Sequence, residues 1–439
     1  MQKGTMKMAT SQLRIAFLTK DGTYLPFAVR CLIEGTEVRA CWTKPRTDKI
    51  GVGMVEEISL GKLSAWKPDA VIVDCTGMGK IADRLRKVGL PVYGGSELAD
   101  LLEYERDKVL DVLEKAGIAV PPTYSTRNVG QAIAHVKKTG ESFVIKLDGE
   151  KGAGSSLTYV GQDPEDVIEM LETYSGKIGG ALINLQKKVR GVEISTEGFF
   201  DGKKFLDGFW NHTLERKKFM NGDIGPNTGC AGDVMWWTDP NKVIEQGIKK
   251  LEPVLARMGF YGQIDLNTIV ERTFEPGKKD PQFKVWGLEL TPRFGINASV
   301  TLMQLTDQPM SRFFVEAAHR QVKDIKKSKG YAVSVTVSIP PHPNKTAEIP
   351  SKDIPVLFDM DLLSRVNPLD MWWNKDHFES AGGGGWICSP AGSGTTLKDA
   401  KYVAYSVVDR INLPNKQYRT DIGDKAAEDI KTLEHWGML

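Results

Sequence analysis

Three short stretches of the chain place charged side chains where they could take part in chemistry. In FVIKLDGEKGAGSS (143–156), an apolar strand delivers Lys146, and Gly149, Gly152 and Gly154 follow at once. Backbone N–H groups of a glycine-rich loop can surround phosphate oxygens, and a lysine adds a positive charge. The pattern GxxxxGK[ST] is absent, so the stretch is not a P-loop. A flexible hairpin with one surface lysine explains it about equally well.

Two further stretches carry acids on expected strands. GQIDLN contains Asp265, and GLELTPRFG contains Glu289 and Thr291, which alternation puts on one face. Two carboxylates on neighbouring strands could hold Mg²⁺, which prefers hard oxygen ligands. Arg293 would point the same way if the strand continued. Two carboxylates and an arginine beside a phosphate-binding loop suit phosphoryl transfer. Taken alone, the solvated face of a half-buried sheet is the simpler interpretation.

Weaker signals come from two other segments. LQKKVRGVEIS (185–195) places Glu193 just after a glycine, where an acid could accept hydrogen bonds from ribose hydroxyls, although a surface acid is the simpler interpretation. NGDIGPNTGCAG (221–232) combines four glycines with a proline and two asparagines and has no apolar face. Glycines allow backbone conformations that other residues avoid, so the second segment indicates a loop built around a ligand.

The elements that must position these residues begin with a parallel α/β pattern. LRIAFL (13–18), EVRACW (37–42), AVIVDC (70–75) and LPVYG (90–94) are short expected strands separated by helices or loops. TKDGTY follows the first strand in place of GxGxxG, so the dinucleotide fingerprint is missing. One periodic helix is expected over 97–117, ended by Gly117 and two prolines.

The remainder of the chain alternates strands and helices to about residue 200. Strands are expected at 260–270 and 283–291, and a third region begins near 328 with the strand 331–339. It ends with a helix opened by the capping box at Thr396. We therefore expect an N-terminal domain over 12–96, a central domain over 97–327 with a lobe at about 120–187, and a C-terminal domain over 328–439.

Composition excludes several classes of protein. The 439 residues carry a formal net charge of +2 and no long run of one sign, so nothing indicates nucleic acid as a partner. No apolar segment approaches the roughly 20 residues of a membrane helix. MQKGTMKMATSQ lacks the apolar core of a signal peptide and is interpreted as a loose leader. Five cysteines without a CxxC pair favour free thiols and a cytoplasmic location.

Taken in order, these residues resemble the ATP-grasp superfamily, in which ATP lies between two α+β lobes. The resemblance implies a parallel pre-ATP-grasp α/β domain, a two-lobed ATP-grasp domain and a small C-terminal α+β domain. It implies ATP with Mg²⁺ or Mn²⁺ as cofactors. The implied nucleotide residues are Lys108, Lys146, the glycine loop and Glu193, and the implied metal ligands are Asp265, Glu289 and Thr291.

Within the superfamily, the chain is most similar to the phosphoribosylamine–glycine ligases. GDIGPNTGCAG resembles their GDxGPNTGGMG loop, LELTPRFG resembles LEFNxRFGDPE, and YRTDIGDKA resembles YRRDIGxRA. The resemblance covers about residues 90–427. It implies purine biosynthesis, with glycine and another small molecule as substrates and a monomer or homodimer. It places Asp223, Pro226, Asn227, Thr228, Gly229 and Arg293 at the substrate.

The sequence also departs from that family. KDGTYLPFAV (20–29) replaces the N-terminal GxGGREHAL, which helps to bind phosphoribosylamine, and Thr291 replaces an asparagine of the metal motif. Ile296-Asn297-Ala298 replaces Asp-Pro-Glu. The implied activity is an ATP-dependent amide synthesis through an acyl phosphate, with Lys146 and Arg293 as catalytic residues. The alternatives are a ligase that uses a different amine, such as a modified nucleotide or base, and a nucleotide-binding module without turnover.

Overall fold

The N-terminal sheet is parallel, as the sequence predicts. A computed structural model describes residues 12–439 except 149–157, 177–179, 275–276, 278–279 and 345–350. The strand order is β3-β2-β1-β4-β5, and all neighbours run parallel. The elements are β1 (Arg14–Thr19), α1 (Leu25–Ile33), β2 (Glu37–Trp42), β3 (Glu56–Glu57), α2 (Leu63–Trp66), β4 (Ala70–Val73), α3 (Gly79–Lys87) and β5 (Val92–Tyr93).

The helix expected over 97–117 is in fact two helices, and that prediction was wrong. The chain forms α4 (Glu97–Tyr104) and α5 (Arg106–Lys115), and Glu105 between them has φ −99° and ψ 79°, outside the helical region. Neither glycine nor proline marks the break. The carboxylate of Asp100 on α4 accepts hydrogen bonds from the backbone of Gly77 and Gly79, so α4 is held to the N-terminal sheet. The periodicity of the sequence is the same on both sides of such a break and cannot reveal it.

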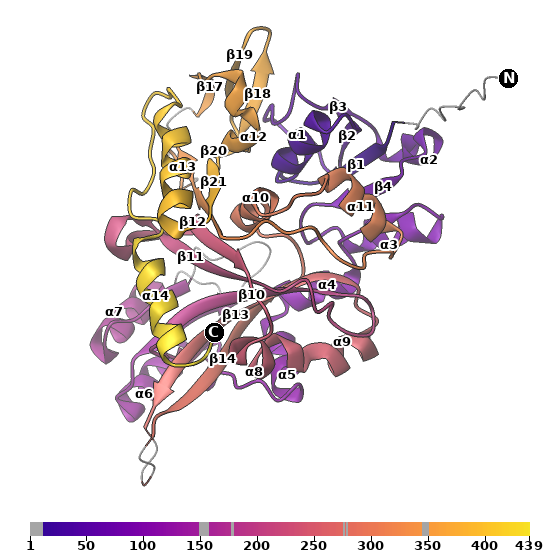
Figure 1. Cartoon of the computed structure of the whole chain (residues 1–439). Helices are drawn as coiled ribbons and strands as arrows, with labels where there is room; N and C mark the ends of the chain where they lie inside the picture. Colours follow the sequence, from indigo (N-terminus) through magenta and orange to yellow (C-terminus); the bar gives the residue numbers. More distant parts are fainter. Residues whose placement is uncertain (1–11, 149–157, 177–179, 275–276, 278–279, 345–350) are drawn as a thin grey trace, which may run out of the picture.

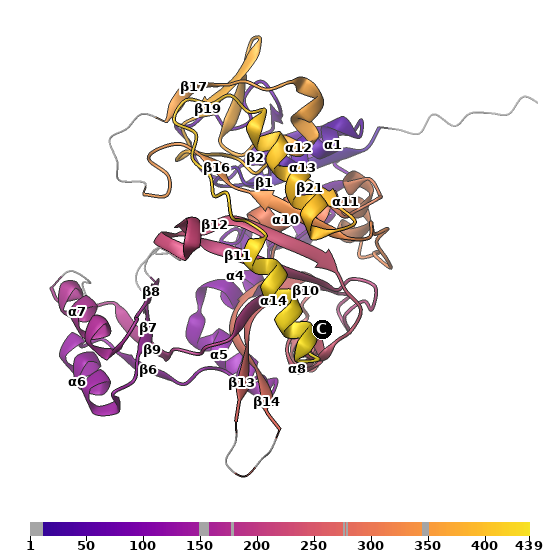
Figure 2. The ribbon, with the colours of Figure 1, turned by 60° about the vertical axis from the view of Figure 1, so that its left-hand side comes forward.

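A separate four-stranded sheet follows, with the order β6-β9-β7-β8 and antiparallel pairing. Two helices lie on it, and it has its own apolar core, so it forms a lobe that projects from the rest of the molecule (Figure 2). The elements are β6 (Thr123–Thr126), α6 (Val129–Thr139), β7 (Phe143–Asp148), β8 (Thr158–Val160), α7 (Pro164–Tyr174) and β9 (Leu182–Lys187).

The central sheet has seven strands in the order β14-β13-β10-β11-β12-β15-β21 (Figure 1). Its strands are β10 (Val192–Phe200), β11 (Asn211–Met220), β12 (Ile224–Trp237), β13 (Gly262–Thr273), β14 (Gln282–Thr291), β15 (Tyr331–Val335) and β21 (Ala391–Gly394). The strand expected at 331–339 is split, because the chain leaves β15 at Thr336 and pairs again as β16 (Val337–Ser338) with β20 (Trp386–Cys388). Strands beyond residue 328 therefore continue the central sheet.

The remaining elements surround this sheet. They are α8 (Lys242–Gln246), α9 (Glu252–Met258), α10 (Ile296–Gln304), α11 (Met310–Ala318), β17 (Lys352–Val356), α12 (Leu363–Val366), β18 (Met371–Asn374), β19 (His377–Ala381), α13 (Leu397–Asp409) and α14 (Asp424–His435). The side chain of Thr396 accepts a hydrogen bond from the backbone of Asp399, which confirms the expected cap of α13. Within the described residues, no helix is long and apolar enough to cross a membrane.

Candidate functional site

One face of the central sheet brings three of the predicted residues together. Strands β13 and β14 pair so that Asp265 lies opposite Thr291 and Asn267 lies opposite Glu289. Residues directly opposite each other on antiparallel strands project to the same face. Leu290 belongs to the buried core on the other face, as the alternation predicts. The Asp265, Glu289 and Thr291 side chains therefore share one face at one end of the two strands.

Lys217 on β11 lies at the centre of this face, although the sequence analysis did not select it. Its Nζ lies 3.1 Å from Oε1 of Glu289, 3.3 Å from Oε1 of Glu193 and 4.0 Å from Oε2 of Glu215. The lysine thus bridges acids contributed by β10, β11 and β14. Glu215 and Lys217 are two residues apart on one strand and so share a face, a pattern that was visible in LERKK but is common on solvated strands.

Charges on this face perturb one another. Burial raises the pKa of Asp265 well above its ordinary value, and the neighbouring acids Glu215 and Glu197 raise it further. Burial also raises the pKa of Glu215. Burial by itself lowers the pKa of Lys217. The nearby carboxylates of Glu289, Glu193 and Glu215 have the larger combined effect, so the pKa is raised well above its ordinary value. Carboxylates outnumber cations here, so the face is suited to bind positive charge.

The donor set of this face fits a hard divalent cation. Asp265, Glu289 and Thr291 offer only oxygen atoms, the ligand type that Mg²⁺ prefers. Asn267, opposite Glu289, donates from Nδ2 to Oε1 of Glu193 at 3.1 Å, while its buried Oδ1 has no hydrogen-bond partner among the described residues. A buried acceptor without a donor indicates a place for water or a ligand. The residues present therefore suit the metal that the resemblance implies.

Arg293 does not project from a continuing strand, because β14 ends at Thr291. Its Nε and Nη2 donate to the carboxylate of Glu103 on α4, at 3.1 Å and 2.7 Å. Burial by itself lowers the pKa of the Arg293 guanidinium. The Glu103 carboxylate has the larger effect, so the pKa is raised. Glu103 is a second residue that sequence reasoning missed, since its partner lies 190 positions away.

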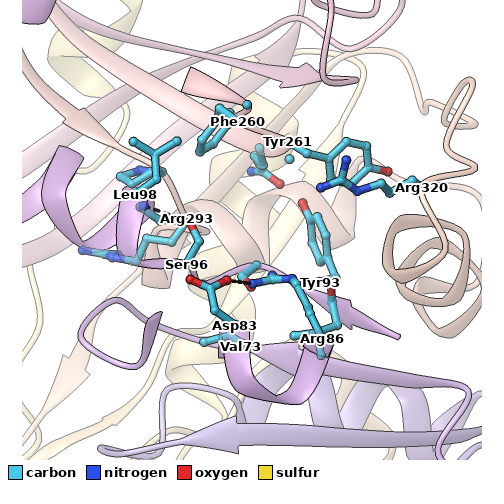
Figure 3. Close-up of a pocket in the computed structure, with 18 of the residues that line it drawn as sticks. Val73, Asp83, Arg86, Tyr93, Ser96, Leu98, Phe260, Tyr261, Arg293 and Arg320 are labelled. Atoms are coloured by element: carbon cyan, nitrogen blue, oxygen red, sulfur yellow. Dashed lines mark hydrogen bonds and ion pairs between the residues drawn. The ribbon is translucent and has the colours of Figure 1, made fainter. Parts of the chain in front are cut away.

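Arg293 also lines a cavity of about 200 Å³ between the end of β5 and the start of β13 (Figure 3). Arg86 projects into this region and donates from Nη1 to Asp83 at 2.7 Å and from Nη2 to the carbonyl of Gly94 at 2.5 Å. The guanidinium of Arg320 lies over the ring of Tyr261, 4.7 Å from its centroid. Arg86 and Arg293 are thus already bound to acids of the protein.

The predicted nucleotide residues lie on other elements. Lys108 is exposed on α5, and its Nζ lies 2.5 Å from Glu105. Lys146 lies on β7, opposite Thr158 of β8 and Asn184 of β9. Gly149, Gly152 and Gly154 lie outside the described residues. The structure therefore places Lys146 in the four-stranded lobe and the acids in the central sheet.

The loop expected over 221–232 is mostly strand, and that prediction was wrong. Asn221–Asp223 form the turn between β11 and β12, and residues 224–232 are the first part of β12 in a long hairpin. Asn227 donates from Nδ2 to the carbonyl of Thr158 at 2.9 Å, so the hairpin contacts the four-stranded lobe beside the strand that carries Lys146. Thr228 donates to the carbonyl of Lys217 at 2.9 Å, which fixes the hairpin to the strand with the central lysine. Pro226 and Gly229 lie within β12 beside these two residues.

Residues of the C-terminal region contact the turn of this hairpin. Arg419, which is 2% exposed, donates to Asp223 at 2.8 Å and to Asp421 at 2.7 Å. Asn221 donates to Thr420 at 2.6 Å. These contacts join YRTDIG to NGDIGP across almost 200 positions, and no sequence spacing could have paired them.

The parallel N-terminal sheet, the projecting lobe and the central antiparallel sheet together form the fold of the ATP-grasp proteins. The chain matches the family model described as "Phosphoribosylglycinamide synthetase, ATP-grasp (A) domain" over residues 107–260. The chain therefore has the fold of the ATP-grasp proteins and is similar to the phosphoribosylamine–glycine ligases, as the sequence predicts.

The sequences of relatives align with this chain over most of its length. The phosphoribosylamine–glycine ligase of Streptomyces coelicolor is 26% identical over 362 residues, which cover 79% of this chain and 81% of the relative. The ligase of Streptococcus suis is 24% identical over 422 residues, covering 90% and 96%.

Solved structures show the same fold. The phosphoribosylamine–glycine ligase of Thermotoga maritima superposes with a TM-score of 0.71 at 18% identity, covering 93% of this chain and 100% of that chain. A biotin carboxylase of Campylobacter jejuni superposes with a TM-score of 0.63 at 13% identity, covering 94% of each chain.

Proposed function

We propose that this protein is an ATP-dependent ligase that joins a carboxylate to an amine through an acyl phosphate, as the phosphoribosylamine–glycine ligases named above are expected to do. The observation that carries the proposal is the face of the central sheet, where Lys217 lies among Glu193, Glu215 and Glu289, with Asp265 and Thr291 alongside. Such an acidic face with one central cation suits a metal-bound polyphosphate better than a solvated sheet surface.

In the proposed mechanism, the substrate carboxylate attacks the γ-phosphorus of ATP and ADP leaves. The amine then attacks the acyl phosphate, so that an amide forms and phosphate leaves. Asp265, Glu289 and Thr291 would hold Mg²⁺, which supplies charge neutralisation at the β- and γ-phosphates when bound. Lys146, Lys108 and Lys217 would add positive charge, and Glu193 would orient the ribose. Arg293 would stabilise the charge that develops during acyl transfer.

The hairpin 221–232 has a proposed role at the substrate. Asp223, Pro226, Asn227, Thr228 and Gly229 lie along the segment that touches both the four-stranded lobe and the strand of Lys217. A segment fixed at these points can position a substrate between the two sheets and exclude water from an acyl phosphate. Because Arg419 already neutralises Asp223, we assign substrate contacts to the backbone of the hairpin.

The proposed ligase could use one of two kinds of amine substrate. Phosphoribosylamine as the amine and glycine as the acid would place the protein in purine biosynthesis in the cytoplasm. A different amine is favoured by the segment KDGTYLPFAV (20–29), which stands in place of the GxGGREHAL that helps the family to bind phosphoribosylamine.

A coupled assay of ADP release tests the proposed function. The purified protein is given ATP, Mg²⁺ and glycine, with and without freshly generated phosphoribosylamine, and then with other amines. We expect ADP release that depends on both an acid and an amine. A protein that is stabilised by Mg-ATP and releases no ADP with any pair would be a nucleotide-binding module.

A further inference from the structure

The cavity of about 200 Å³ between β5 and β13 lies apart from the proposed nucleotide residues. Arg86 reaches it from α3, and Arg320 reaches it from the segment that follows α11 (Figure 3). Both helices lie on the side of the molecule away from the lobe that carries Lys146 (Figure 1). A single water needs about 10–15 Å³, so the cavity has room for a ligand of several non-hydrogen atoms.

Arg320 brings a positive charge to this cavity that no carboxylate of the described residues pairs. The side chain is exposed, and its guanidinium lies 4.7 Å from the centroid of the Tyr261 ring. The backbone of Arg320 has a φ of 56°, in the left-handed region that glycine adopts more easily than arginine. An arginine held in this conformation indicates that its side chain has a use.

Arg86 contributes a second guanidinium, and the two repel each other. Burial lowers the pKa of Arg86, Asp83 offsets part of this effect, and the positive charge of Arg320 adds to the lowering. Arg86 donates to Asp83 and to the carbonyl of Gly94, but its side chain is 31% exposed and a guanidinium has five N–H groups. N–H groups therefore remain for a ligand, and an anion between the two guanidiniums would remove their repulsion.

The acids beside the cavity are already used by the protein. Asp83 accepts hydrogen bonds from Arg86 through Oδ1 and from the backbone of Glu97, the first residue of α4, through Oδ2. Asp201 acts on the charge of Tyr261, but its Oδ1 accepts hydrogen bonds from the backbone of residues 203 and 204 in its own loop. Neither acid is thus free to pair with Arg320.

The charges around the cavity favour an anion. Three arginines and one aspartate line it, and Glu103 pairs with Arg293, so three positive charges stand against two negative ones. The segment that begins at Arg320 adds to the positive field, because it contains one acid, Asp324, and four lysines, namely Lys323, Lys326, Lys327 and Lys329. Such a field raises the local concentration of anions.

The opposite wall of the cavity is apolar. Leu98 and Phe260 lie across the cavity from Arg86 (Figure 3). A ligand with one anionic group and a small carbon body would therefore contact both walls. Guanidinium groups bind phosphate oxygens through pairs of hydrogen bonds, and a phosphate monoester carries about two negative charges at neutral pH, which two guanidiniums match.

We infer that this cavity binds a small phosphate-bearing anion, whose phosphate lies between the guanidiniums of Arg86 and Arg320 and joins α3 to the segment after α11. Two sources carry this group, namely inorganic phosphate, which the proposed reaction releases, and a phosphate monoester of a small sugar. The binding does not require turnover, so it is independent of the proposed ligase activity.

Calorimetric titration of the full-length protein tests the inference, with Mg-ADP present to occupy the proposed nucleotide site. The probes are inorganic phosphate and ribose 5-phosphate, and ribose is the uncharged comparison. Arg320→Gly removes the guanidinium, and glycine adopts a φ of 56° easily, so the melting temperature without ligand should change little. Arg320→Lys keeps the charge without the planar guanidinium. Arg312→Gln, on α11, is the matched control, because it removes the same charge from an exposed ion pair.

We expect inorganic phosphate or ribose 5-phosphate to bind with a Kd below about 1 mM, and ribose not to bind. Arg320→Gly should weaken this binding about tenfold or more, because charge-assisted hydrogen bonds are lost. Arg320→Lys should bind with an intermediate affinity, and Arg312→Gln should bind as the wild type does. Tighter binding of ribose 5-phosphate than of inorganic phosphate would identify a monoester as the ligand, and the reverse order would identify the inorganic ion.

Three results would overturn the inference. They are no binding of either phosphate, binding that neither Arg320→Gly nor Arg320→Lys weakens, and an equal loss in Arg320→Gly and Arg312→Gln, which would reflect surface charge in general. Ribose that binds as tightly as ribose 5-phosphate would exclude recognition of the phosphate. A failed ADP-release assay together with phosphate binding at Arg320 would remove the proposed reaction and leave the site.

Discussion

At the scale of single residues, the acidic face of the central sheet shows how one lysine holds several carboxylates together. Lys217 contacts Glu289 and Glu193 at little more than 3 Å, and Glu289 is also a proposed metal ligand. Removing the lysine should therefore destabilise the protein, whereas removing one acid should not, although both changes should reduce ADP release about a hundredfold or more.

Glu289→Ala should reduce ADP release by about a hundredfold or more, because a group that positions transition-state charge typically contributes that much. The melting temperature without nucleotide should stay equal or rise, because one of several crowded carboxylates is removed. Steady-state kinetics and thermal unfolding check both parts. Turnover equal to that of the wild type would remove Glu289 from the metal site. Glu245→Ala, on an exposed ion pair of α8, is a suitable control.

Lys217→Met should also reduce ADP release by about a hundredfold or more, but it should destabilise the protein without nucleotide by about 1–2 kcal/mol. The value is lower than for a fully buried pair, because the side chain of Lys217 is 31% exposed. Saturating Mg-ATP should recover part of the loss, since the metal then supplies positive charge. Denaturant unfolding with and without Mg-ATP measures the difference, and equal losses in both conditions would contradict this role.

At the scale of elements, strands β10 and β11 and the cap of α8 share a buried polar network away from the reacting groups. His212 on β11 lies 3.0 Å from Oγ1 of Thr196 through Nδ1 and 2.8 Å from Nδ2 of Asn241 through Nε2. It joins the sheet to the N-terminus of α8, where Asn241 is the cap. The histidine thus has a structural position inside the sheet.

This network predicts a pH dependence of stability. Burial lowers the pKa of His212 from 6.5 to about 4 in the folded protein. The unfolded chain therefore binds one more proton between these values, so stability is complete above about pH 6.5 and falls as pH decreases toward 4. His212→Gln should make the free energy of unfolding less dependent on pH in this window. Denaturant unfolding at pH 4.5 and pH 7.5 checks it, and an unchanged slope would show that His212 does not titrate as expected.

At the scale of the whole molecule, the proposed nucleotide residues belong to two sheets. Lys146 lies in the four-stranded lobe, and the acids lie in the central sheet (Figure 2). Among the described contacts, the hydrogen bond from Asn227 to Thr158 links the two sheets at the hairpin. A ligand that binds both sheets should therefore stabilise the molecule as a unit.

Mg-ATP at about 100 times its Kd should raise the melting temperature by about 3 °C, which corresponds to about 2.7 kcal/mol for a chain of this length. ATP with excess EDTA should produce a much smaller shift, because the acidic face repels the phosphates when no metal is bound. Differential scanning fluorimetry measures both shifts. Equal shifts with and without EDTA would contradict a metal-dependent nucleotide site.

Sequence alone determined four of the five strands of the N-terminal sheet, all except β3, together with the pairing of 260–270 with 283–291 and the common face of Glu289 and Thr291. These depend on local apolar patterns and on the alternation of side chains along a strand, which the tertiary structure keeps. The family resemblance followed from short motifs that are specific without any knowledge of contacts.

The tertiary structure decided the rest. It broke the helix at Glu105, divided the strand at Thr336, and placed Lys217 among acids from three strands and Arg86 and Arg320 at one cavity. Each of these depends on contacts between positions far apart in the chain, for which local patterns contain no information. The sequence shows which side chains are charged. Whether a charged side chain has an oppositely charged neighbour depends on which strands lie next to each other in the fold.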